Sequence, residues 1–147
     1  MKNILVALEL EYDDLTKDML TEASQLAKAF DAKCWLVHVA SQDPDFISQG
    51  IEPQYVKDVL EKDMEDMHIK IQTYANDLMA KGVEAEGLII KGSTTEILKK
   101  EVEKLSIDLL VLGNKQHSFI FNIFVSSTTD KLIDYINVPV LLVPEKK

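Results

Sequence analysis

The chain has 147 residues, of which 46% are hydrophobic and 28% are charged, as is typical of a single globular domain. Its formal net charge of −9 argues against a nucleic acid or an anionic membrane surface as partner, because both would repel it. A single cysteine, Cys34, excludes an internal disulfide framework and a cysteine-rich zinc site. We see no apolar run of membrane-span length and no signal-peptide pattern, so we expect a cytoplasmic protein.

Five apolar runs have the length and composition of buried strands: residues 3–10, 33–40, 85–91, 108–112 and 138–143. Most of them are continuous rather than alternating, which is typical of strands that are covered on both faces of a parallel sheet. Cys34 and His38 lie inside the second run. We therefore expect a buried, inert thiol and a histidine that is satisfied in the core or at the strand end.

Helical patterns separate these runs. Apolar positions recur at helical spacing over residues 15–30 and 56–78, and Lys81-Gly82 after the second stretch is a good helix stop. Ser93 and Glu96 have capping-box spacing at the start of a third helix, and residues 128–136 form a fourth. This alternation predicts one α/β domain over residues 1–147, with parallel strands joined by right-handed crossovers.

A ligand site is expected at the carboxyl ends of the strands, where a sheet of order 3-2-1-4-5 reverses its strand order between strands one and four. Glu9, at the end of strand one, could accept hydrogen bonds from a ribose or an adenine-sized ligand, and Gly113 ends strand four. Ser126 and Ser127 stand at the start of the fourth helix. They either bind an anion together with the free backbone N–H groups there or merely cap the helix.

Other candidate chemistry is weak. The acids Glu11, Asp13 and Asp14 follow strand one and are expected to offset the dipole of the first helix. A Mg²⁺ cluster is the alternative, although the acids in this stretch cannot all converge on one ion. No Ser/His/Asp, Cys/His or paired-carboxylate arrangement stands out, so we predict no catalytic residues, no metal ligands and no enzymatic activity.

Four stretches resemble the universal stress protein (UspA-like) family, and the resemblance covers the whole chain: "NILVALE", "WLVHVA", "GSTTEILKKEVEKLSIDLLVLG" and "DKLIDYINVPVLLVPE". The last two are the most specific. The resemblance implies a Rossmann-like open parallel sheet of five strands, order 3-2-1-4-5, with helices on both faces. It also implies dimerisation through the last strand and, in many members, ATP or AMP bound between strands one and four.

Nucleotide-binding members of that family carry G-x2-G-x9-G-[ST] after strand four. The frame falls here on Gly113, Gln116, Ser126 and Ser127, so two of the three glycines are replaced. Gln116 removes backbone freedom and room that phosphate oxygens would need, whereas the small Ser126 is more tolerable. Glu9 stands where those members usually have an aspartate.

The segment between the replaced glycines, residues 119–125, is unusually apolar, and its phenylalanines could fold back and fill the crevice. Few positive charges lie nearby, namely Lys115, Lys131 and, if protonated, His117, so a triphosphate would be poorly compensated. We therefore predict no tight ATP binding and no cofactor. The alternative is ATP or AMP, with or without Mg²⁺, held through Glu9, the backbone of Val39, Gly113, Ser126 and Ser127.

The last apolar run is expected at an edge of the sheet, where an uncovered apolar strand is an aggregation hazard. Pairing with its own copy about a two-fold axis would cover it, and the predicted interface residues are Val138, Val140, Leu141, Leu142 and Val143. The alternative is that residues 119–124 cover this edge within one chain.

We therefore expect a regulatory or stress-response homodimer with little nucleotide binding, and an ATP- or AMP-binding member of the family as the runner-up. A phosphoacceptor receiver domain is a third possibility, from another class. It needs an aspartate at the end of strand three, and residues 89–92 offer none. The sequence does not identify a protein partner.

Overall fold

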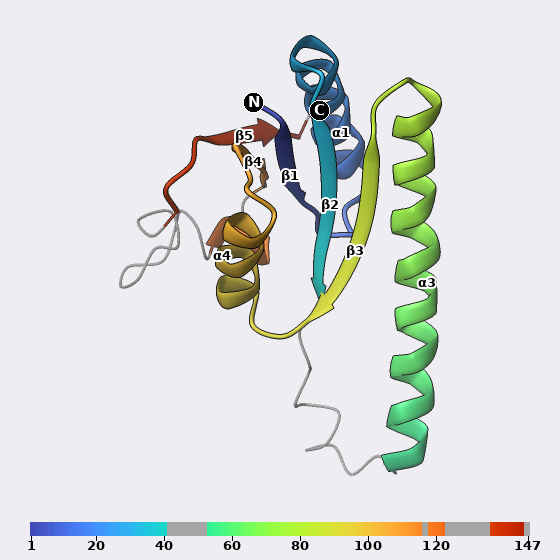
Figure 1. Ribbon diagram of the computed structural model, residues 1–147. Coiled ribbons are helices and arrows are strands. Elements are labelled where there is room, and N and C mark those ends of the chain that lie inside the picture. The colour runs from blue at the N-terminus through green and yellow to red at the C-terminus, as the bar shows by residue number, and fades with distance from the viewer. Residues whose placement is uncertain (41–52, 116–117, 123–135, 146–147) are drawn as a thin grey trace.

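The computed structural model describes residues 1–40, 53–115, 118–122 and 136–145. Five parallel strands form one sheet of order β3-β2-β1-β4-β5, which confirms the predicted α/β fold (Figure 1). The strands are β1 (Asn3–Ala7), β2 (Lys33–Ala40), β3 (Ala85–Lys91), β4 (Leu109–Asn114) and β5 (Val140–Pro144). The helices are α1 (Asp13–Phe30), α3 (Pro53–Ala80), α4 (Thr94–Lys104) and the single turn α5 (Phe119–Phe121).

The core lies in two layers because successive side chains of a strand point to opposite faces of the sheet. In β1, Ile4 and Val6 face the layer that is covered by α1 and α3, whereas Leu5 and Ala7 face the layer of α4. Figure 1 shows α1 and α4 on opposite sides of the sheet and α3 running along β3. Helices on both faces are thus confirmed.

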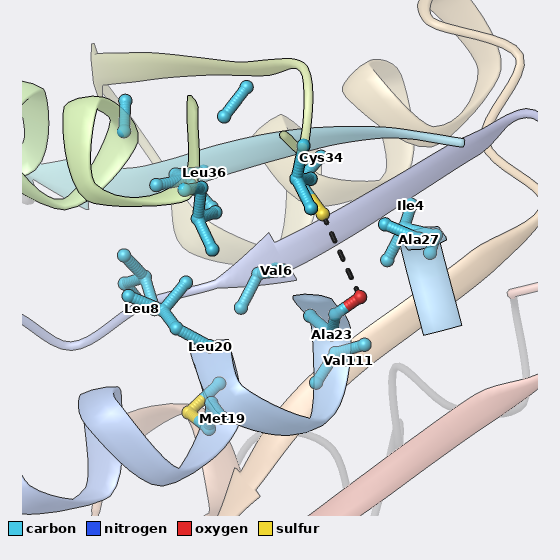
Figure 2. Packing of buried hydrophobic residues seen from close by; sticks show 14 of the residues in the cluster. Ile4, Val6, Leu8, Met19, Leu20, Ala23, Ala27, Cys34, Leu36 and Val111 are labelled. Atoms are coloured by element: carbon cyan, nitrogen blue, oxygen red, sulfur yellow. Dashed lines mark hydrogen bonds between the residues drawn. The ribbon is translucent and has the colours of Figure 1, made fainter. Parts of the chain in front are cut away.

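The core layer beneath α1 explains why the Cys34 thiol is buried and unreactive. Its side chain extends from β2 toward α1, and its Sγ is 4.0 Å from the Ala23 carbonyl oxygen (Figure 2). The residue is fully buried, and burial raises the pKa of the thiol from 9.0 to about 11. The thiolate is the reactive form, so Cys34 is the inert core residue that the sequence predicts.

Element boundaries differ from the sequence prediction where burial continues past the ladder. The first apolar run was expected to be a strand through residue 10, yet β1 ends at Ala7. Leu8 and Leu10 stay buried in the following turn, which is closed by a bond from the Tyr12 N–H to the Glu9 carbonyl. Similarly, β5 begins at Val140 rather than at residue 138.

Helix ends are partly as predicted. Gly82, with φ of +86°, follows the end of α3 and confirms the helix stop. The predicted capping box of the third helix is wrong: Ser93 is the N-cap of α4, but its side chain makes no capping bond. Ser93 is exposed, so its hydroxyl and the first N–H groups of α4 can be satisfied by water instead.

The predicted fourth helix lies outside the described residues except for its last residue, Ile136, which packs on the core beneath α4. None of the described helices combines the length and the apolar composition that crossing a bilayer requires.

Candidate functional site

The turn after β1 and the turn after β4 meet at the carboxyl ends of the strands. The backbone N–H of Ile120 donates to the Glu9 carboxylate, with 2.6 Å between the Ile120 nitrogen and Oε1. Ser118 fixes the α5 turn, because its buried hydroxyl accepts from the Phe121 N–H at 3.2 Å and its own N–H donates to the Lys115 carbonyl at 3.1 Å. The predicted crevice between strands one and four is therefore bridged by a direct contact.

A cavity of about 240 Å³ remains on the β2 side of this contact. It is lined by Leu8, Glu9, Glu11, His38, Val39, Ala40, Met67, Thr94 and Ile120. A second, more open hollow of about 300 Å³ shares Glu11, His38 and Met67 with it and extends along α3 to Asp63, Asp66 and Lys70.

On the β4 side the space is much smaller. A hollow of about 10 Å³ is lined by Ala7, Glu9, Leu15, Thr16, Met19, Gly113, Ser118 and Ile120. Glu9 and Ile120 line both this hollow and the cavity of about 240 Å³. Their contact therefore separates the cavity of about 240 Å³ near Val39 from the hollow of about 10 Å³ near Gly113.

The structure brings together some of the predicted site residues. Glu9 and Val39 share the cavity of about 240 Å³, and Glu9 and Gly113 share the hollow of about 10 Å³. The other three, Gln116, Ser126 and Ser127, lie outside the residues that the structure describes.

Gly113 has a packing reason that the loop motif does not suggest. A Cβ added there would lie 2.5 Å from Leu15 Cδ2 and 3.1 Å from Met19 Sδ, both on α1. The missing side chain thus lets α1 pack directly on β4.

Two lysines near the crevice are already bound by carboxylates. Lys115, next to the end of β4, lies 2.5 Å from Glu145, and this hydrogen bond raises the pKa of the lysine. Lys70 of α3 lies 2.6 Å from Asp13 and also donates to the Leu10 carbonyl at 2.6 Å. Asp13 therefore does more than offset the dipole of α1, because it ties this turn to α3.

The same contact perturbs two titrations. Hydrogen bonds first from Lys70 and then from Tyr74 lower the pKa of Asp13. Burial, and then Asp13 itself, raise the pKa of Tyr74 from 10.0 to about 12. Asp13 and Lys70 are thus paired with each other, and their ion pair holds the turn after β1 against α3.

The remaining charge around the chambers is negative. Glu9 and Glu11 line the cavity of about 240 Å³. Glu11, Asp63 and Asp66 line the hollow of about 300 Å³. Within the described ranges, no group of three His, Cys, Asp or Glu side chains is arranged to hold a metal ion.

Of the residues that line the cavity of about 240 Å³, only Glu9 and Val39 were predicted as site residues; the polar His38 and Thr94 and the inward-facing Ile120 are among those that sequence reasoning missed. His38 donates from Nδ1 to the Leu8 carbonyl at 3.0 Å, because a carbonyl oxygen can only accept. Its ring is therefore hydrogen-bonded as expected, and it also lines the cavity. Thr94 follows the carboxyl end of β3. Since ligand sites lie at the carboxyl ends of the strands, this position in the sequence could have indicated it. For Ile120, the apolar segment was noticed, but the prediction named phenylalanines as the residues that fill the space.

The model of the universal stress protein family matches residues 1–144. UspA from Lactobacillus plantarum is similar in structure, with 18% identity, a TM-score of 0.72 and coverage of 97% of each chain. An Arabidopsis thaliana family protein with AMP bound has 15% identity and a TM-score of 0.66, covering 99% of this chain and 93% of that one.

An Archaeoglobus fulgidus universal stress protein in complex with dAMP has 14% identity and a TM-score of 0.68, with coverage of 97% and 98%. A search of curated protein sequences found no match. The family match spans nearly the whole chain, and the neighbours resemble its fold over at least 97% of its length. This chain belongs to the universal stress protein family.

Proposed function

We propose that this chain is a non-enzymatic regulatory universal stress protein that acts as a homodimer and does not hold ATP tightly. The observation that carries the proposal is the 2.6 Å contact between the Ile120 N–H and the Glu9 carboxylate. This bond occupies the Ile120 N–H, the Glu9 carboxylate and the space between them. A nucleotide bound in the crevice would need all three.

The fit of a nucleotide to these residues is unequal. The chamber of about 240 Å³ has apolar walls at Leu8, Val39 and Ile120 and suits a base-sized group. The hollow that Gly113 lines measures about 10 Å³, so this hollow is too small for a phosphate group. A triphosphate carries a charge of about −4, and the lysine next to β4 is neutralised by Glu145.

The second candidate function is binding of AMP or ATP. It is supported by the size of the chamber, by Glu9 at its edge, and by neighbours that are described in complex with cAMP, dAMP or AMP. In that case the base would lie near Val39, and Glu9 would have to exchange its bond to Ile120 for one to the ligand.

Titration calorimetry with ATP and with AMP, each with and without Mg²⁺, separates the two candidates. We expect no saturable heat at ligand concentrations up to about 1 mM. Dissociation constants of about 10 µM or tighter would overturn the proposal and establish the second function. A parallel assay of phosphate release tests the absence of hydrolysis.

Two variants test whether Ile120 is the obstacle. Ile120→Ala keeps the backbone N–H that bonds Glu9 and removes only side-chain volume between the chambers. If that volume is what excludes the ligand, the variant should give measurable AMP binding where the unaltered chain gives none. Ile69→Ala is the matched control, because Ile69 is 66% exposed on α3. If neither variant binds AMP, Ile120 is not what excludes the nucleotide.

The homodimer part of the proposal depends on β5, which lies at one edge of the sheet. Leu142 is 36% exposed, and Val138, Val140 and Leu141 are half-buried. Val143 packs inward with 4% exposure, so its side chain belongs to the core of one chain and only its backbone could join an interface.

The alternative cover for this edge, the segment 119–124, is only partly described. Ile120 is bonded to Glu9 at the β1 end of the crevice, which places this residue away from the outer edge of β5. Sedimentation equilibrium measures the oligomeric state, and a monomer at all concentrations would contradict the homodimer.

A further inference from the structure

The cavity of about 240 Å³ and the hollow of about 300 Å³ adjoin each other, because Glu11, His38 and Met67 line both. Figure 1 shows α3 extending beyond the carboxyl ends of β2 and β3, so side chains of this helix can line a space there. The two hollows together reach from Thr94, at the start of α4, to Asp63 on α3.

Carboxylates dominate the charge of the hollow of about 300 Å³. Asp63 and Asp66 line it from neighbouring positions of one α3 face, and Glu11 lines it from the turn after β1. Its lysine, Lys70, is already paired with Asp13 at 2.6 Å. The lining therefore attracts a cation and repels an anion.

These carboxylates suit an extended cation better than a metal ion. Within the described ranges, no three His, Cys, Asp or Glu side chains are arranged to hold a metal. Apolar side chains share the lining, namely Leu10, which is 4% exposed, and the half-buried Met67. A ligand that matches carries separated positive charges on an aliphatic stem, which can lie along apolar surface as a lysine stem does.

Thr94 points independently to a ligand in the cavity of about 240 Å³. It lines this cavity and is only 5% exposed. Among the residues that the structure describes, its hydroxyl has no hydrogen-bond partner. A buried hydroxyl without a partner is unfavourable, so its oxygen is available to a donor that enters the cavity.

His38, which lines both hollows, is a second acceptor. Its Nδ1 donates to the Leu8 carbonyl, so Nε2 carries the lone pair in the neutral ring. A protonated amine has only N–H donors, and it therefore complements the imidazole, the Thr94 hydroxyl and the carboxylates alike.

We propose that the two adjoining hollows bind a linear aliphatic polyamine. One ammonium group donates to Thr94, another pairs with Asp63 and Asp66, and the methylene stem lies along Met67. The site goes beyond the regulatory homodimer proposed above and does not depend on it, because all of its residues belong to one chain. A bound polyamine occupies the cavity that the second candidate function assigns to a nucleotide base.

Titration calorimetry with spermidine tests the site. We expect one site per chain, with a dissociation constant below about 100 µM at low salt. The singly charged 1-aminobutane should bind at least about tenfold more weakly, because it cannot engage both hollows at once. Absence of saturable binding, or equal binding of 1-aminobutane, would refute the proposal.

Two double variants separate the site from general attraction to an acidic chain. Asp63→Asn with Asp66→Asn should weaken spermidine binding about three- to tenfold. Glu65→Gln with Asp77→Asn removes the same charge from α3 at residues that line neither hollow, and should change affinity less than about twofold. Equal losses in both double variants would mean that the attraction is diffuse.

Thr94→Val keeps the shape of the side chain but removes the acceptor, and should weaken binding about three- to tenfold. Thr95→Val is the matched control, since Thr95 lines neither hollow. Thermal unfolding reports whether either variant is destabilised. Unchanged affinity in a folded Thr94→Val variant contradicts the proposed contact.

Methionine methyl NMR locates the bound amine. Spermidine should shift the signal of Met67, which Met67→Leu assigns, and leave that of Met79 unchanged, because Met79 lies near the other end of α3. A Met67 signal that saturating spermidine does not move refutes the site. Tight ATP binding in calorimetry, or a monomer in sedimentation, refutes the proposed function instead, so the two failures are distinguishable.

Discussion

The two edges of the sheet are built differently. At the β3 edge, α3 packs so closely that a Cβ on Gly87 would lie 3.1 Å from Ile71 Cγ2, and Lys33 pairs with the exposed Glu86. At the β5 edge, Leu142 is exposed and its neighbours Val140 and Leu141 are half-buried. Charge and a covering helix protect the first edge, and the second carries apolar side chains.

This difference bears on which edge strand, β3 or β5, could pair with another chain. Charged residues on an edge strand oppose pairing with another chain, whereas an apolar edge invites it. The β5 edge is therefore the one at which the homodimer proposed above would form. Four predictions would break or sharpen this contrast.

The largest effect is expected for Gly113→Ala, beside the β5 edge. The new Cβ would overlap the buried Leu15, so the variant should lose about 1–3 kcal/mol in the free energy of unfolding measured by urea. Gly87→Ala is the matched change at the β3 edge, where the nearest atom is 3.1 Å away, and should lose less. Equal losses would show that α1 and α3 are packed with similar tightness.

Leu142→Lys should weaken dimerisation roughly tenfold or more, because it places a charge in the centre of the proposed interface. Sedimentation equilibrium gives the dissociation constant. Ile69→Lys makes the same chemical change at a 66% exposed site of α3 and should leave that constant unchanged. If both variants dimerise normally, β5 is not the interface.

Tyr74→Phe tests how α3, the helix that packs on β3, is tied to the turn after β1. The pKa of Tyr74 is raised from 10.0 to about 12 in the folded chain, so its contribution is complete below about pH 10 and is lost as the pH rises toward 12. The free-energy difference between the unaltered chain and Tyr74→Phe should therefore shrink across this window. Solvent screening reduces the size of the change, because Tyr74 is only half-buried. A difference that stays constant from pH 9 to 12 would contradict the raised pKa.

The smallest effect is expected for Ser93→Ala, where the chain leaves β3 and enters α4. A capping serine normally contributes about 1 kcal/mol, but this side chain makes no capping bond. The variant should change the free energy of unfolding by less than about 0.5 kcal/mol. A loss near the normal value would mean that the hydroxyl caps the helix in solution.

The sheet could be predicted from the sequence because its determinants are local. Continuous apolar runs mark strands that are buried on both faces, and their alternation with helical periodicity fixes parallel crossovers. Strand limits were less accurate, since burial of Leu8 and Leu10 in a turn is indistinguishable from burial in a strand when only hydrophobicity is read.

The location of the crevice could also be predicted, but its contents could not. The bond between Glu9 and Ile120 joins residues 111 positions apart, and it depends on one turn of helix after β4. Nothing in the pattern of residues 119–125 distinguishes an isoleucine that turns inward from the phenylalanines beside it. Likewise, the pairing of Lys115 with Glu145 depends on the exact register of β4 and β5.

Gly113 shows how a signature residue can be retained for reasons of volume. It stands at the first position of the glycine motif that the family resemblance implies, yet here α1 lies against the position that its side chain would occupy. A glycine at this position is therefore no evidence of ligand binding by itself, because the packing of α1 on β4 already requires it. In this architecture the glycine could persist after every other requirement for the ligand had been relaxed.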